Sequence, residues 1–316
     1  MICVSSLDEL AADGINRIVL SCGAYDGLHT GHQNILKTLH ELADKHDATP
    51  VVLSFSPHPR KILTPNNALE LIFSEEHKVK QLEDFGVKAV VLIPFTKAFS
   101  QIEAETFIAS LFSIEGLDIK AMTVGEKWRF GRMAKGDINL LTNASKTYNF
   151  EFRPIKESMN GDIKISSSSI RQLLKAGDLE GVKELLGRHY SIYGEVIKGR
   201  GIAKEKYNYP TANLGSANEI FPPLGIYAAI AKLNGQSHEA IAYIGKAETD
   251  CLETPDRPFV EAHLFDFNEN IYGQHLELEL LRFIREDRKF NNEEALLKQI
   301  HDDIEKVQQF HQRMED

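Results

Sequence analysis

Apolar runs alternate with amphipathic stretches along the first 187 residues. Residues 32–46 carry leucine and isoleucine at helical spacing, at positions 35, 36, 39 and 42, which predicts a helix with one apolar face. Ser74 is predicted to cap a helix that ends at Gly86, and Ser100 with Glu103 predicts a capping box for the next helix. This alternation predicts a parallel sheet covered on both faces, a doubly wound α/β domain. Its strands are expected at residues 17–22, 50–55, 87–94, 119–124 and 151–155.

The pattern changes after two short predicted helices at residues 166–174 and 178–186. Short alternating runs then follow one another without helices between them, separated by Gly, Pro, Asn and Asp turns. Residues 267–271 predict a hairpin connection, and residues 291–314 a terminal amphipathic helix. We therefore predict two domains, 1–187 and 188–316, the second a small antiparallel β-barrel. Its strands are expected at residues 191–197, 225–233, 239–244, 259–267 and 276–284.

Composition narrows the class of protein. The chain has 316 residues, 42% of them hydrophobic, and a formal net charge of −10, which disfavours nucleic-acid binding through general basicity. The three cysteines are scattered and suit a reducing cytoplasm better than a disulfide framework or a zinc site. Apolar runs fall far short of the roughly 20 residues of a membrane span, and the N-terminus does not look like a signal peptide. We expect a cytoplasmic enzyme with neither nucleic acid nor membrane as a partner.

The most informative segment is Gly-Ala-Tyr-Asp-Gly-Leu-His-Thr-Gly-His at residues 23–32, between the first strand and the first helix. Glycines allow close backbone approach to a polyphosphate, and a helix N-terminus offers free N–H groups. His29 and His32 are three residues apart, so both imidazoles can approach one phosphate and offset charge on a leaving pyrophosphate. Two structural histidines or a metal-binding pair are the alternatives, but the flanking glycines and the strand–helix context favour the phosphate site.

Segment 23–32 resembles the Gly-x-Phe-Asp-Gly-x-His-x-Gly-His signature of HxGH nucleotidyltransferases. Residues 54–59 resemble Thr-Phe-x-Pro-His-Pro, residues 124–131 resemble Val-Gly-x-Asp-Phe-x-Phe-Gly, and residues 165–171 resemble Ile-Ser-Ser-Thr-x-Ile-Arg. Together with the second half, this order of motifs is similar to that of the bacterial bifunctional riboflavin kinase/FMN adenylyltransferases, also called FAD synthetases. The resemblance covers nearly the whole chain.

The resemblance implies that the first domain transfers AMP from ATP to FMN, giving FAD and pyrophosphate, with Mg²⁺ as cofactor. His29, His32 and Arg171 are the implied catalytic residues. On its own, the serine run before Arg171 would be a helix cap or linker. The implied ATP- or phosphate-binding residues are Gly23, Tyr25, Asp26, Gly27, Gly31, Ser166, Ser167, Ser168 and Gly199; the implied flavin-binding residues are His58, Lys127, Trp128, Phe130, Tyr227 and Arg285.

Two residues of the implied flavin-binding set, Lys127 and Trp128, stand out in the sequence. Lys127 stands where the family usually has Asp or Asn, and a lysine can donate but not accept a hydrogen bond. Flavin recognition or the order of substrate binding is expected to differ there. Trp128, the single tryptophan, either stacks on an isoalloxazine or adenine ring or packs at the edge of the core.

In the second half, residues 209–214 resemble the Phe-Pro-Thr-Ala-Asn motif of riboflavin kinases, and residues 260–263 resemble Val-Glu-x-His. Thr211 and Asn213 are two apart on an extended segment, point the same way, and are the implied Mg²⁺ ligands. Glu261 is the implied base for the riboflavin 5′-hydroxyl. Without this context, the first segment would be a turn and Glu261 an exposed strand residue.

The kinase half departs further from the family. The loop that begins at Gly199 lacks the later glycines, so Lys204 and Lys206 are hypothesised to bind phosphate instead, and residues 245–249 lack the proline that usually precedes Thr249. We therefore weigh three functions: conversion of riboflavin to FMN and of FMN to FAD; FMN adenylylation with an impaired kinase; or a non-catalytic, flavin-binding regulatory paralogue. Riboflavin, FMN and ATP are the expected small-molecule partners. The sequence leaves the oligomeric state open.

Overall fold

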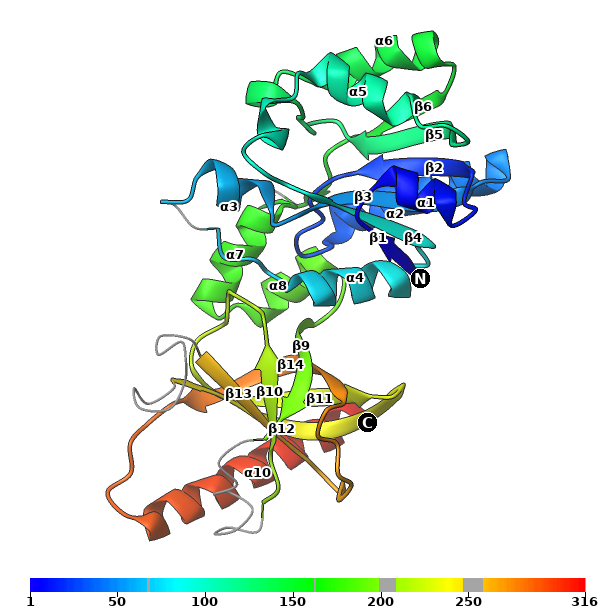
Figure 1. The fold of residues 1–316 in the computed structure, drawn as a ribbon. Helices are drawn as coiled ribbons and strands as arrows, with labels where there is room; N and C mark the ends of the chain where they lie inside the picture. Colours follow the sequence, from blue (N-terminus) through cyan, green and yellow to red (C-terminus); the bar gives the residue numbers. More distant parts are fainter. Residues whose placement is uncertain (67–68, 162, 199–208, 247–257, 316) are drawn as a thin grey trace. The chain divides into compact units, whose positions relative to one another are not determined.

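The computed structural model describes residues 1–66, 69–161, 163–198, 209–246 and 258–315. The chain divides into two compact units (Figure 1). The α/β unit comprises Met1–Glu70 and Lys78–Ser167, and the barrel unit comprises Leu71–His77 and Ser168–Asp316. The two units are defined by which residues contact one another in space. The predicted boundary between the functional domains at residue 187 stays a prediction.

The α/β unit is built on a six-stranded parallel sheet in the order β1-β4-β3-β2-β5-β6. All five predicted strands are present, and β1, a three-residue edge strand too short to show a pattern, was not predicted. The order reverses between β2 and β5, as in doubly wound folds. The strands are β1 (Ile2–Val4), β2 (Arg17–Cys22), β3 (Thr49–Ser56), β4 (Ala89–Pro94), β5 (Asp118–Gly125) and β6 (Glu151–Ile155).

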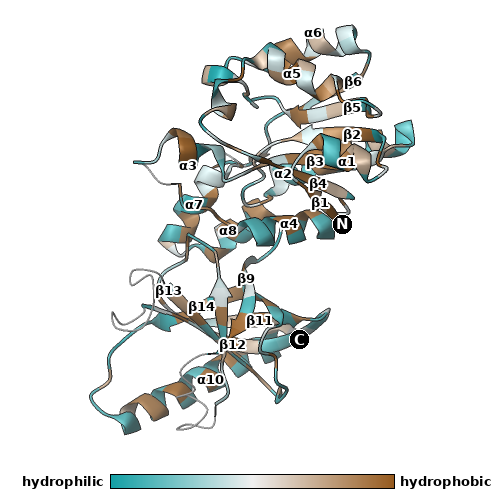
Figure 2. Cartoon of the chain, viewed as in Figure 1, coloured by the Kyte–Doolittle hydropathy of each residue, from teal (hydrophilic) through white to brown (hydrophobic). Residues whose placement is uncertain are grey.

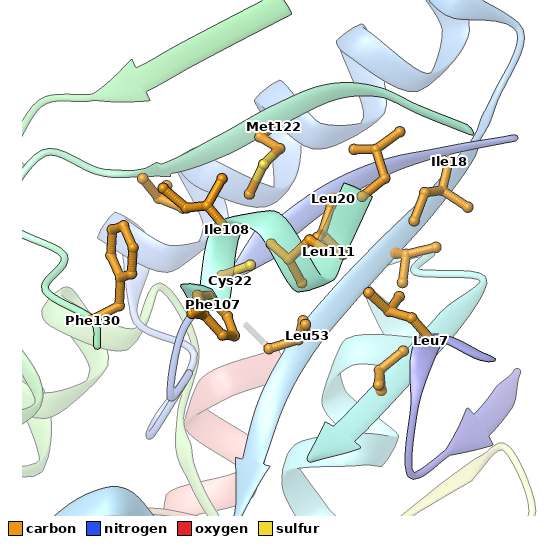
Figure 3. Packing of buried hydrophobic residues seen from close by; sticks show 14 of the residues in the cluster. Leu7, Ile18, Leu20, Cys22, Leu53, Phe107, Ile108, Leu111, Met122 and Phe130 are labelled. Atoms are coloured by element: carbon orange, nitrogen blue, oxygen red, sulfur yellow. The ribbon is translucent and has the colours of Figure 1, made fainter. Parts of the chain in front are cut away.

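Helices cover both faces of this sheet. The helices are α1 (Leu7–Ala12), α2 (Thr30–His46), α3 (Pro59–Leu63), α4 (Glu75–Asp84), α5 (Ala104–Phe112) and α6 (Ile138–Tyr148), with short 3₁₀ turns at Phe99–Gln101 and Arg132–Ala134 and a small hairpin of β7 (Met159–Asn160) and β8 (Ile163–Lys164). Successive strand residues point to opposite faces, so β2 buries Leu20 against α5 on one side and Val19 against α2 on the other. Figure 3 shows the first of these two clusters, and Figure 2 the concentration of hydrophobic residues in the central strands. Such doubly buried strands require nearly continuous apolar runs.

One predicted helix start was right and another was wrong. Ser74 caps α4, since its Oγ accepts a hydrogen bond from the His77 N–H at 3.1 Å. The predicted capping box at Ser100 and Glu103 does not form. Ser100 Oγ instead donates to the Lys97 carbonyl at 2.7 Å within a 3₁₀ turn, and Glu103 accepts from Arg132 at 3.1 Å. Ser100 thus bonds within its own turn and Glu103 bonds a distant arginine, so neither side chain caps the helix that begins at Ala104.

The barrel unit contains a closed antiparallel barrel in the order β10-β13-β12-β11-β14-β9. Every predicted strand is present. The hairpin predicted at residues 267–271 is wrong, because β13 pairs with β10 and β12 while β14 pairs with β11 and β9. The unit's elements are α7 (Ser167–Ala176, whose first residue falls in the α/β unit), α8 (Leu179–Leu186), β9 (Tyr190–Ile197), β10 (Ala212–Ser216), β11 (Gly225–Leu233), β12 (Gln236–Lys246), β13 (Pro258–Leu264), β14 (His275–Glu286) and α10 (Glu293–Glu315).

Alanine fills much of the barrel interior. Closing six short strands leaves a narrow centre, and small side chains fit it where large ones would force the strands apart. The hairpin between β11 and β12 turns at Asn234 and Gly235, which both have positive φ (49° and 81°), as a two-residue type I′ turn requires. The buried alanines are Ala212, Ala228, Ala229, Ala231, Ala240, Ala242 and Ala262.

A buried polar network ties residues 71–77 to the barrel. The Leu71 N–H donates to Glu219 at 2.9 Å, and the Ile220 N–H donates to the Leu71 carbonyl at 3.3 Å. His77 is fully buried, with Nε2 3.3 Å from the Glu277 carboxylate, which also accepts from Ser191 Oγ at 2.8 Å. These bonds explain why a segment that precedes β4 in the chain belongs to the barrel unit.

Glu151, at the start of β6, gives the α/β unit a specific acid sensitivity. Hydrogen bonds from Lys45 (2.7 Å), His46 and Arg153 lower the pKa of Glu151 from 4.5 to about 2. A carboxyl with a lowered pKa contributes its full stability above about pH 4.5 and loses it as the pH falls toward 2. We expect Glu151→Gln to lower the urea midpoint at pH 6, and this difference to shrink steadily below about pH 4.5. Exposed Glu115, changed to Gln, is the control; a difference independent of pH would contradict the prediction.

Candidate active sites

The segment 23–32 lies at the topological switch point of the sheet. It follows the carboxyl end of β2, and the neighbouring strand on the far side of the reversal, β5, ends at Gly125. In open α/β sheets, ligands bind beyond the carboxyl ends of the strands at this point, where the two chain connections run to opposite faces and leave a crevice. The sequence therefore placed the glycine-rich segment correctly for a ligand site.

The two predicted histidines come together. His29 is the N-cap of α2, and its Nδ1 accepts a hydrogen bond from the His32 N–H at 3.2 Å. Their rings stack with centroids 3.7 Å apart and planes 13° from parallel. Since Nδ1 of His29 must offer a lone pair, the proton of the neutral ring lies on Nε2. That N–H is a donor suited to a phosphate oxygen.

Tyr25, a predicted ATP-binding residue, packs against the ring of His32. It is buried, with a positive φ of 53°, and its ring lies 5.1 Å from that of His32. Ser21 Oγ donates to the Thr123 carbonyl at 2.7 Å, so the Tyr25 hydroxyl donates to Ser21 across 2.5 Å. Burial raises the pKa of Tyr25 well above its ordinary value. A Cβ at Gly23 would lie 3.0 Å from this ring, so glycine there makes room for it.

The rest of the loop packs around the histidines. Asp26 is 5% exposed, and its carbonyl accepts from Ser167 Oγ at 2.8 Å, which ties the loop to the start of α7. Gly27 has a φ of 85°, a conformation that favours glycine. At Gly31 a Cβ would lie 3.1 Å from His29 Nδ1, closer than most real contacts. The spacing of the motif thus reflects the room that the His29 ring needs.

Gly31→Ala therefore separates stability from activity. Alanine favours a helix over glycine by about 1 kcal/mol, so thermal stability should be unchanged or slightly higher. The new methyl group should displace the His29 ring and its stack with His32, and we expect FAD formation from FMN to fall about tenfold. Riboflavin phosphorylation by the same protein is the internal control. A variant with full adenylylation would show that the His29 ring does not need this place.

The predicted anion-binding turn coincides with the start of α7. Ser166 precedes the helix, Ser167 and Ser168 form its first turn, and Arg171 follows Ser167 by four residues, on the same helix face. Ser167 bonds the Asp26 carbonyl, so part of the serine run has a structural task. Gly199, the remaining predicted phosphate-binding residue, lies outside the described residues, as do Lys204, Lys206 and Thr249.

The predicted flavin-binding residues of the α/β unit have clear local contacts. His58 caps α3, its Nδ1 accepting from the Arg60 N–H at 3.2 Å. Lys127 is exposed and forms a 2.6 Å ion pair with Glu157, whose hydrogen bond raises the pKa of Lys127. Trp128 stacks on buried Phe130 with ring centroids 4.6 Å apart and packs against the core. Of the two interpretations of Trp128, packing at the core edge is therefore observed.

In the barrel, the predicted base and a predicted metal ligand lie opposite each other. Asn213 on β10 is the register partner of Glu261 on β13. Directly opposed residues of antiparallel strands have Cβ atoms roughly 5 Å apart on one face of the sheet. Ala212 and Leu214 are buried in the barrel, so Asn213 and Glu261 lie on its outer face, and Thr211 precedes β10 with the same alternation. The register thus brings together Asn213 and Glu261, two of the residues predicted for this site, and their roles stay predictions.

Tyr243 belongs to the same row and was missed from the sequence. It is the register partner of Glu261 on the other side, in β12. Burial, with smaller contributions from Asp287 and Glu261, raises the pKa of Tyr243, so it stays protonated. A Cβ at Gly245 would lie 2.7 Å from the Tyr243 ring. The signal was present in the alternation of β12, but only pairing with β13 connects it to Glu261.

Tyr227 and Arg285, the other predicted flavin-binding residues, contact the protein itself. Tyr227 is 1% exposed, its hydroxyl donates to the Pro223 carbonyl, and burial raises its pKa. Arg285 Nε and Nη2 lie 2.8 and 2.7 Å from Oδ2 of buried Asp303 in α10. Both side chains therefore organise the barrel unit, Arg285 by anchoring its terminal helix.

The donor set of the barrel suits Mg²⁺ chemistry. Over the residues that the structure describes, no group of three or more His, Cys, Asp or Glu side chains could hold a metal ion. Mg²⁺ commonly uses one or two protein oxygens together with water and substrate phosphates. The Thr211 hydroxyl and the Asn213 amide oxygen supply only oxygen ligands, which fits such a site. No helix in the described ranges is long and apolar enough to cross a membrane.

The two halves of the chain match the models of two enzyme families, one a nucleotidyltransferase and the other a small-molecule kinase. The FAD synthetase family model matches residues 13–169, and the riboflavin kinase family model matches residues 186–311. The chain therefore belongs to the bifunctional riboflavin kinase/FMN adenylyltransferase family.

Relatives cover nearly the whole chain. The bifunctional riboflavin kinase/FMN adenylyltransferase of Bacillus subtilis is 34% identical over 294 residues, with 90% of each chain covered. That of Haemophilus influenzae is 32% identical over 300 residues, covering 93% of this chain and 96% of the relative. A crystal structure described as a macrolide-efflux protein from Streptococcus pneumoniae has 27% identity and a TM-score of 0.77, covering 93% and 94% of the two chains. The predicted two-part fold is thus confirmed.

Proposed function

We propose that this chain phosphorylates riboflavin to FMN in its barrel and adenylylates FMN to FAD in its α/β unit, with ATP as the donor in both reactions. The opposition of Asn213 and Glu261 carries the proposal, because it supports activity in the half that departs further from the family. An impaired kinase and a non-catalytic flavin-binding paralogue are not favoured, since models of both enzyme families match. The functional domains are taken as residues 1–187 and 188–316.

In the kinase reaction, Glu261 takes the proton of the riboflavin 5′-hydroxyl, and the oxygen attacks the γ-phosphorus of ATP. The new P–O bond forms as the bond to the β-phosphate oxygen breaks, and ADP leaves. Thr211 and Asn213 would hold Mg²⁺, which when bound would supply charge neutralisation on the phosphates. Tyr243 contributes a neutral phenol beside Glu261, so the row carries the negative charge on the base alone.

In the adenylyl transfer, an FMN phosphate oxygen attacks the α-phosphorus of ATP, and pyrophosphate leaves. The nucleophile is already an anion, so no protein base is required and positioning supplies most of the catalysis. His29 donates Nε2–H to the phosphates, and His32 is held beside it by the ring stack and by Tyr25. Arg171 and the serines at the start of α7 bind the departing phosphates.

The partners follow from these chemistries. Riboflavin, FMN, ATP and Mg²⁺ are the ligands we propose, without nucleic acid or membrane. A cytoplasmic location agrees with the three scattered cysteines.

A chromatographic time course tests the proposal. Purified protein is incubated with ATP and Mg²⁺ and either riboflavin or FMN, and the flavins are separated at intervals. FMN followed by FAD from riboflavin is the expected result. FAD from FMN alone would restrict the function to adenylylation. Neither product, with flavin still bound, would replace the enzyme by a flavin-binding protein.

A further inference from the structure

Strand β13 carries a second residue of interest besides Glu261. This is His263, two positions further along and on the same side of the strand. Its Nδ1 lies 2.8 Å from the carbonyl oxygen of Pro210. A carbonyl can only accept a hydrogen bond, so Nδ1 of His263 carries a proton and donates. The two residues are 53 positions apart in the chain, so this bond joins distant segments.

The bond falls where the regular ladder ends. Strand β10 pairs with β13 through Ala212, Asn213 and Leu214. Pro210 and Thr211 precede this ladder, and proline has no N–H to donate to a neighbouring strand. The carbonyl of Pro210 is its one backbone hydrogen-bonding group, and His263 binds it.

Tyr209 holds the same segment from the other side. Its ring meets the His263 ring edge-on with centroids 5.5 Å apart, and its hydroxyl lies 3.0 Å from Nδ1 of His301 on α10. His263 thus contacts both Tyr209 and Pro210, the two residues that directly precede Thr211.

We propose that His263 is a positioning residue of the kinase: it holds Pro210 so that Thr211 and Asn213 face Glu261 with the spacing that Mg²⁺ and the γ-phosphate require. The inference rests on the proposed kinase function and adds a residue that acts through its hydrogen bond to Pro210. A shift of about 1 Å in a positioned group commonly costs a hundredfold in rate, so one hydrogen bond at this point has a large effect.

The test compares His263→Leu with His263→Asn, because the Asn amide N–H lies close to the place of Nδ1 and can donate to Pro210. His263→Leu should lower kcat for riboflavin phosphorylation about tenfold to a hundredfold and raise the Mg²⁺ concentration for half-maximal rate. The KM for riboflavin should change less than about twofold, since the proposed role of His263 is to hold Pro210 and not to bind the flavin. His263→Asn should restore the rate to within about threefold of wild type. FMN adenylylation and the thermal unfolding profile of each variant together report correct folding.

Two measurements without turnover complete the test. Nitrogen-15 NMR of the protein free of nucleotide should show the His263 proton on Nδ1, and calorimetry should show weaker binding of Mn²⁺–ADP to His263→Leu than to His263→Asn. Full kinase activity in His263→Leu, equal loss in both variants, or a proton on Nε2 alone would overturn the proposal.

If His263→Leu also loses adenylylation, Tyr209→Phe takes its place. We expect this variant to lose about threefold in kinase rate and to need more Mg²⁺ for half-maximal rate, and an unchanged kinase would overturn the proposal. A wild-type protein that adenylylates FMN but leaves riboflavin untouched would refute the kinase, whereas the NMR result would still judge the contact.

Discussion

His32→Ala should lower FAD formation from FMN by at least about a hundredfold, because a donor positioned at the transferring phosphates is worth that much in comparable sites. The substitution also removes the ring that stacks on His29 at 3.7 Å, so His29 loses its fixed orientation. Riboflavin phosphorylation, which depends on residues of the barrel, should stay within about twofold of wild type. Both rates are measured in the same chromatographic assay.

His40 provides the matched control for this variant. It lies further along α2, and its Nε2 contacts the Phe85 carbonyl at 2.9 Å. In His40→Gln the amide N–H takes the place of Nε2–H, so both activities should persist. If His32→Ala destroyed both activities while remaining folded, the assignment of two independent sites would be wrong.

Glu261→Gln should have the converse effect. The amide keeps the size of the side chain but cannot take a proton, and loss of a general base typically costs a factor of about 10² to 10⁴ in rate. FMN formation from riboflavin should fall by that factor, while FAD formation from FMN continues. Initial rates with each flavin separate the two effects.

Glu279 serves as the control in the barrel. It lies on β14 and pairs with Lys232 at 2.6 Å, away from the row that contains Glu261. Glu279→Gln removes a carboxylate from the same barrel and should leave the kinase rate unchanged. Kinase activity retained in Glu261→Gln would exclude Glu261 as the base and direct attention to another group of the row.

The pattern of residues was sufficient for most of the fold because burial repeats at short range. Apolar runs identified β2 to β5, a weaker run identified β6, and apolar residues at helical spacing identified α2, since each pattern depends only on neighbours in the chain. The errors came where a local signal had a competing partner. Ser100 donates a hydrogen bond to the Lys97 carbonyl of its own turn and does not cap the following helix. Residues 267–271 connect β13 and β14, which pair with other strands and not with each other.

The motifs were also readable locally, because the chemistry of a phosphate site needs certain residue types at fixed spacing. The physical reason for individual residues of these motifs, in contrast, could be seen only in the structure. Gly31 is required by the ring of His29, and Tyr25 is held by Ser21, which in turn bonds Thr123 on a strand 102 residues away. Tyr243 belongs to no motif, and only the register of β12 with β13 places it opposite Glu261.

The sequence by itself thus determined most of the longer strands and helices and the candidate residue types at both sites, because periodic burial and motif spacing act over a few residues. Tertiary structure alone decided that Asn213 faces Glu261, that His263 holds Pro210, and that residues 71–77 join the barrel unit. The reason is physical: strand register and buried hydrogen bonds are set by the closure of the whole barrel and by the need to pair every buried polar group. Neither condition can be evaluated until distant segments have met.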